Sequence, residues 1–143
     1  MQRFATCVLA VVVACGTAIV VAQKVTTAEQ LDQTMKRIGP AQQGAAKAIQ
    51  SMAYAEAKTN VATVKKALTD AENFWVVNKK DDALKMSKDA IAKVTAVEEA
   101  LSAAAPDQQA VMAAFKQVGA TCLGCHKAYR AQDENQQYIL KLQ

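Results

Sequence analysis

Proline and glycine, which interrupt regular secondary structure, are scarce in this chain, and so are aromatic residues. Its 143 residues include two prolines, five glycines and 5% aromatic residues, whereas 52% of the residues are hydrophobic. Few breakers and many small apolar side chains favour closely packed helices over strands. A chain of this length holds one domain besides a leader.

Histidine and strong net charge are also scarce. His126 is the single histidine, and nothing in the chain resembles an acid–base pair poised for catalysis. We therefore expect no enzymatic activity. The net charge is +4, and no basic run with interleaved aromatic residues is present, so nucleic-acid binding is not expected. At most, this mild charge favours an acidic redox partner.

The N-terminal segment is typical of a secretory signal peptide. Arg3 precedes an apolar run of about 19 residues that ends at Ala22, with small residues before Gln23. We predict a signal peptide over 1–22 and a domain over 23–143. Two alternatives remain: an uncleaved membrane span, and a lipid on Cys15, whose preceding residues resemble a bacterial lipobox. The apolar residues after Cys15 favour cleavage after Ala22.

All three alternatives place the domain outside the cytoplasm. We expect a periplasmic protein, or one anchored to the membrane on the periplasmic side. Contact with the membrane is expected only if the leader is retained or Cys15 is lipidated.

The remainder of the chain shows helical periodicity in four amphipathic segments. A capping box at Thr27 starts the first, and Gly39-Pro40 should kink it. A weak break over 51–54 and a polar turn over 78–82 separate the next segments. Pro106 in the first turn and Asp107 at the N-terminus open the last. Four such segments with short connections predict an all-α antiparallel four-helix bundle, with cofactor sites among facing helices.

The most specific motif is Cys122-Leu123-Gly124-Cys125-His126. This Cys-x-x-Cys-His spacing is typical of covalent c-type haem attachment. Two thiols add across the vinyl groups of the porphyrin, and the adjacent imidazole reaches the iron. A zinc site would need about four ligands, and a thioredoxin-like dithiol would need a βαβ unit. The chain offers neither, so haem is the favoured interpretation.

The motif continues the apolar stripe of the last segment. Val111, Phe115 and Val118 precede Cys122 at steps of three and four residues. A haem attached there would be tucked between helices, near the C-terminal end of the last one.

Together, the helical pattern and the late Cys-x-x-Cys-His motif resemble the class II c-type cytochromes, which include cytochrome c prime and its methionine-ligated, low-spin relatives. The specific parts are residues 122–130 and Thr34-Met35-Lys36-Arg37-Ile38-Gly39. The resemblance implies one haem on Cys122 and Cys125, with His126 as proximal iron ligand. In the low-spin branch a first-helix methionine takes the sixth position, which corresponds to Met35.

The resemblance also assigns roles to residues around the haem. Tyr129 is expected to pack against the porphyrin. Arg130 follows His126 by four residues and is expected over the same helix face. Cytochromes c prime commonly carry an arginine where this chain has Leu31, and Lys36 or Arg37 is the expected substitute.

The function implied is single-electron transfer, with redox proteins of unknown identity as partners. The alternative is a five-coordinate protein that binds NO or CO, which applies if Met35 does not bind the iron. Because relatives often dimerise through their first two helices, a homodimer is among the expected assemblies.

Overall fold

The computed structural model describes residues 24–142, and the predicted leader lies outside this range. These residues form five helices followed by a short hairpin. The helices are α1 (Ala28–Lys36), α2 (Ile38–Gln50), α3 (Tyr54–Val77), α4 (Asp81–Leu101) and α5 (Gln108–Tyr129), and the strands are β1 (Arg130–Gln132) and β2 (Tyr138–Leu140). The prediction of an all-α fold is confirmed, and the two-stranded hairpin is an addition that the sequence pattern did not predict.

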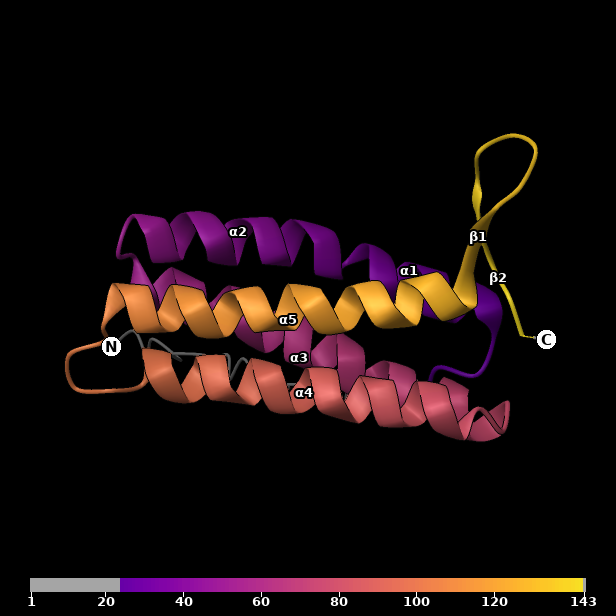
Figure 1. The fold of residues 1–143 in the computed structure, drawn as a ribbon, viewed down its shortest axis with the longest axis horizontal. Helices are drawn as coiled ribbons and strands as arrows, with labels where there is room; N and C mark the ends of the chain where they lie inside the picture. The colour runs from indigo at the N-terminus through magenta and orange to yellow at the C-terminus, as the bar shows by residue number, and fades with distance from the viewer. Residues whose placement is uncertain (1–23, 143) are drawn as a thin grey trace, which may run out of the picture.

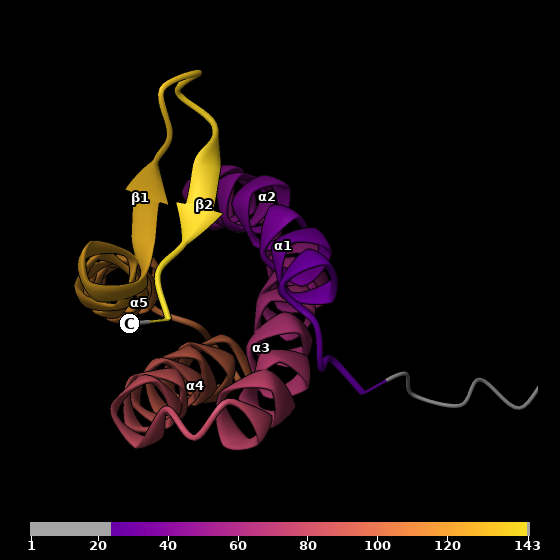
Figure 2. The ribbon, with the colours of Figure 1, turned by 90° about the vertical axis from the view of Figure 1, so that its right-hand side faces the viewer.

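The long helices lie side by side, and consecutive long helices reverse direction (Figure 1). α1 and α2 follow one another along one edge, and both pack on α3. α4 packs between α3 and α5, whereas α5 contacts α2 only lightly. Seen end-on, the hairpin stands beside α5 on the side of α1 and α2 (Figure 2). Small residues allow close approach: a Cβ at Gly44 of α2 would lie 2.7 Å from Oδ1 of Asn60 of α3.

The first helix begins and ends where local chemistry dictates. The capping box predicted at Thr27 is confirmed, because its hydroxyl accepts from the Gln30 backbone N–H and the Gln30 side chain accepts from the Thr27 N–H. The interruption lies at Arg37, three residues before Pro40. Pro40 has no N–H to donate to the Lys36 carbonyl, so the helical ladder is broken at that point.

The other boundaries follow the sequence closely. α2 gives way to α3 within 51–53, and α3 to α4 within 78–80. Both turns use a non-glycine residue in the left-handed region, Met52 at φ 58° and Lys79 at φ 53°. The first-turn role predicted for Pro106 is wrong, because Asp107 is the N-cap and Pro106 precedes it. Oδ1 of Asp107 accepts from the Ala110 N–H at 2.7 Å.

The apolar core has two parts. The first cluster fills the middle and one end of the helical body and is built mostly of Ala, Val and Ile. Its buried members are Ile38, Ala41, Ala45, Ala48, Ile49, Ala57, Val61, Val64, Ala67, Leu68, Ala90, Val94, Val97, Leu101, Val111 and Val118. The second cluster carries the large aromatic residues. Its buried members are Val25, Leu31, Ala71, Phe74, Trp75, Ala83 and Tyr129.

Among the helices of residues 24–142, none is both long enough and apolar enough to cross a membrane.

Candidate cofactor site

The C-terminal turns of α5 carry the two thiols and the imidazole of the motif. Cys122 and Cys125 are free thiols and are half-buried. Cys122 packs against the first cluster, and Cys125 packs against the second. His126 follows on the same helix and is exposed. The thiols thus lie three residues apart on the inward side of one helix, at the junction of the two clusters.

Burial and neighbouring charges shift the pKa values of Cys125 and His126. Burial raises the pKa of the Cys125 thiol, and the nearby Cys122 and the Asp82 carboxylate raise it further. Partial desolvation and then the positive charge of Arg130 lower the pKa of His126. At neutral pH the Cys125 thiol therefore keeps its proton and the imidazole is uncharged. A neutral imidazole is the form that binds a metal ion.

Met35 lies in the last turn of α1 and is partly buried. Its side chain packs against both apolar clusters. It thereby shares one cluster with Cys122 and the other with Cys125. The structure brings the methionine predicted as an iron ligand to the same junction as the thiols. α1 packs mainly on α3 rather than on α5, so the two elements that carry the predicted ligands are not in close contact.

Gln42 is a site residue that the sequence did not single out. Its Nε2 lies 3.7 Å from Sγ of Cys122 and donates a weak hydrogen bond to it. The residue is on α2 and half-buried. The sequence feature that could have identified Gln42 is its long polar side chain, seven residues after Met35 on an otherwise apolar stripe.

Tyr129 closes the second cluster at the end of α5. Its ring is buried and lies 5.2 Å from the Trp75 ring, centroid to centroid. Its hydroxyl donates to Oδ1 of Asp82 at 2.5 Å. This hydrogen bond, with smaller effects of burial and of the Asp82 charge, raises the pKa of Tyr129 to about 12. The same bond lowers the pKa of Asp82. The predicted contact of Tyr129 with a porphyrin stays a prediction.

Trp75 and Phe74 are core aromatic residues. Their rings lie 5.1 Å apart in an edge-to-face arrangement, and both are buried in the second cluster. Partly buried Leu140 and Leu142 pack on this cluster beside Cys125. The residues after α5 therefore complete the apolar surroundings of one thiol.

The expected helical position of Arg130 is wrong. The helix ends at Tyr129, and Arg130 is its extended C-cap, with φ −118° and ψ 135°. It pairs with Leu140 in the hairpin, and its guanidinium carbon lies 3.1 Å from the centre of the Tyr138 ring. The sheet register and this cation–π contact hold the guanidinium on the hairpin. Its role toward a cofactor stays a prediction.

The cations expected to replace an arginine at Leu31 are engaged elsewhere. Leu31 is buried in the second cluster. Lys36 pairs with Asp32 at 2.6 Å, and Arg37 reaches Asp70 at 3.5 Å. Neither pair involves the thiols or the second cluster.

Within residues 24–142, no three or more His, Cys, Asp or Glu side chains converge as a metal-ion site. A haem needs no such cluster, because the porphyrin nitrogens already hold its iron and the protein adds axial ligands. Two free thiols and a methionine at one apolar junction, with the neutral imidazole of the exposed His126 next in sequence to Cys125, fit such a group. The chain matches no protein-family model, and no curated protein or solved structure is significantly similar to it. The function proposed below therefore depends on the residues of this chain alone.

Proposed function

We propose that this chain is an exported electron-transfer protein, an antiparallel four-helix bundle carrying one covalent haem. Cys122 and Cys125 would form the thioethers, and His126 and Met35 would bind the iron. The proposal joins the motif to the helical fold, and it includes removal of residues 1–22 on export. No catalytic residue is assigned.

The arrangement of Met35 and the thiols about the two clusters is the observation that carries the proposal. Each thiol packs on a different cluster, and Met35 packs on both. A flat apolar group attached to both thiols would therefore border the two clusters on which Met35 also packs. Soft thioether sulfur is a suitable ligand for haem iron, and a His/Met pair raises the reduction potential relative to other ligand sets.

The residues around the site each have a part in holding the cofactor. The thiols fix its position along α5, and the neutral imidazole of His126 offers a nitrogen lone pair. Gln42 restrains the sulfur of Cys122 through its amide. Trp75 and Tyr129 exclude water from the side of Cys125. When bound, the haem supplies an iron that alternates between ferrous and ferric states, which is a one-electron couple.

Two measurements on exported, purified protein test the proposal. Intact mass after acid–acetone extraction should exceed the mass of the polypeptide by one haem, because thioethers survive this treatment. The absorption spectrum should be that of a low-spin, six-coordinate centre in both oxidation states. Loss of all haem on extraction would refute covalent attachment.

The second candidate function is binding of NO or CO at an open iron position. One observation favours it: α1 has nine residues and ends at Lys36, directly after Met35. So short a helix, broken from α2 at Arg37, can move without unfolding the longer helices. A high-spin spectrum of the unmodified protein would favour this function over electron transfer.

A further inference from the structure

The outward face of α5 is bare next to the thiols. Four of its residues, Lys116, Ala120, Leu123 and Lys127, recur at steps of three and four and therefore form one stripe, here called the outer α5 stripe. All four are exposed, and 72% of the Leu123 surface is accessible. Leu123 is among the most exposed large apolar side chains of residues 24–142. Such a side chain amid cations is unusual unless something covers it.

Two glycines keep this face flat. A Cβ built at Gly119 or Gly124 would meet no heavy atom within 4 Å. No side chain of the described residues covers the backbone there. A partner can therefore approach the backbone of α5 closely on both sides of Leu123.

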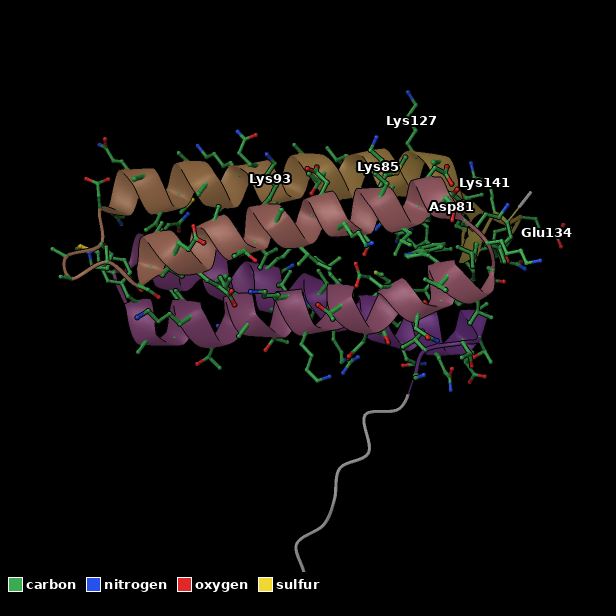
Figure 3. The ribbon with its side chains drawn as sticks, turned by 90° about the horizontal axis from the view of Figure 1, so that it is seen from below. Asp81, Lys85, Lys93, Lys127, Glu134 and Lys141 are labelled. Carbon is green, nitrogen blue, oxygen red and sulfur yellow. The ribbon has the colours of Figure 1, made fainter. Side chains whose placement is uncertain are left out.

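Positive charge predominates around Leu123. No Asp or Glu occurs from residue 108 to 132. Lys85 and Lys93 of α4 project toward the same edge of the molecule as Lys127 (Figure 3). None of these three lysines pairs with a carboxylate of residues 24–142. Asp89, between the two α4 lysines in sequence, is the acidic exception on that side.

The stripe lies on the helix that carries both thiols. Leu123 lies between Cys122 and Cys125 in sequence, and His126, which precedes Lys127, is also exposed. Because the thiols are on the inward side of α5, a protein seated on Leu123 would be separated from them by the thickness of one helix, about 10 Å. This proximity distinguishes the stripe from the lysines on other helices.

We propose that the outer α5 stripe is the docking surface for an acidic electron-transfer protein, which covers Leu123 with an apolar spot ringed by carboxylates. The inference depends on the proposed function. The exchange moves one electron and no proton or heavy atom, so one protein is oxidised as the other is reduced. An anionic membrane is the less favoured occupant, because insertion needs an apolar helix face rather than one leucine.

Amide chemical shifts of the 15N-labelled, full-length exported protein test docking independently of electron transfer. The probe is oxidised flavodoxin, an acidic flavoprotein, added at about 10 mM ionic strength, where the screening length is about 30 Å. Shift changes should centre on 116–127 and the facing part of α4. They should vanish at about 1 M salt, where that length is about 3 Å.

Charge reversal supplies the matched comparison. The double variant Lys116→Glu with Lys127→Glu should weaken flavodoxin binding at least about tenfold, and Leu123→Ser should weaken it less and independently of salt. The control is Lys47→Glu with Lys58→Glu, which changes the net charge equally at exposed positions of α2 and α3. It should alter the affinity less than about twofold.

Three outcomes would overturn the inference. They are equal weakening in the control, shift changes centred elsewhere, and binding to phosphatidylglycerol vesicles without binding to flavodoxin. The absorption spectrum of each sample tests the cofactor separately. A sample without haem refutes the proposed function, whereas its amide shifts still show whether flavodoxin docks on the stripe.

Discussion

Replacing Met35 by alanine separates the two candidate functions. The thioether of Met35 is the only part of α1 proposed to reach the iron. Its removal should leave an open sixth position or admit water. The iron should therefore shift toward high spin, the reduction potential should fall, and the ferrous form should bind CO.

The fold should survive this substitution. Truncating a fully buried Met to Ala costs about 2–5 kcal/mol. Met35 is only partly buried, so we expect a loss at or below the lower limit, about 1–2 kcal/mol. For a domain of this size, that loss corresponds to a fall in Tm of about 4–8 °C. The haem proposed at Cys122 and Cys125 would still join the two clusters in the variant.

Met112→Ala is the matched control for Met35→Ala. Met112 is also partly buried and packs against the first cluster, but it lies on α5 ten residues before Cys122, about 15 Å along the helix. This control should lower Tm by a similar amount and leave the spectrum, the potential and CO reactivity unchanged. If the unmodified protein is already high-spin and binds CO readily, Met35 is a packing residue and the reasoning fails.

Three further changes test other parts of the interpretation. The double change of Cys122 and Cys125 to alanine should leave a protein that melts broadly and at lower temperature. The reason is that burial of a large apolar group, which stabilises the fold by about 25 cal/mol per Å2, is lost. An apoprotein that unfolds as cooperatively as the holoprotein would contradict this. N-terminal sequencing of exported protein should begin directly after Ala22, whereas an intact Met1 or a lipidated cysteine would show another type of leader. Tyr129→Phe should flatten the dependence of Tm on pH at both extremes. The raised pKa of the phenol stabilises the fold fully below its ordinary 10.0, and this contribution is lost as pH rises through about 12. The lowered pKa of Asp82 stabilises the fold above its ordinary 3.8, and this contribution is lost in acid. If the Tm of the variant depends on pH at both extremes as that of the unmodified protein does, the hydrogen bond is absent in solution.

The helices could be predicted because their signals are local. The capping box at Thr27, the breaks near 51–54 and 78–82, and the acidic start at Asp107 all lie within a few residues of the boundaries they set. The hairpin could not be predicted, because three-residue strands are too short to show a period of two. Its turn depends on contacts such as the Asp133 side chain accepting from the Gln137 N–H at 2.8 Å.

In the candidate site, too, the residues with local signals could be predicted and the tertiary contacts could not. The thiols and the imidazole were predicted because their spacing on one helix carries the chemistry. The partners across the fold were not predicted: Gln42 meets Cys122 over 80 residues of chain, and Tyr129 meets Asp82 over 47. Such pairs depend on how helices are aligned in space, and the period of a single segment contains no information about that alignment.

The division of the core into two clusters has a consequence for hydrogen exchange. Among the described residues, sixteen are buried in the first cluster and seven in the second. Local opening costs less free energy where fewer apolar side chains are buried. Amides of α1 and of the C-terminal turns of α5 should therefore exchange with solvent deuterium before those in the middle of α3 and α4. The end of the molecule that holds Met35 and Cys125 should then open briefly while the rest stays folded, and each opening would release the iron ligand proposed at Met35.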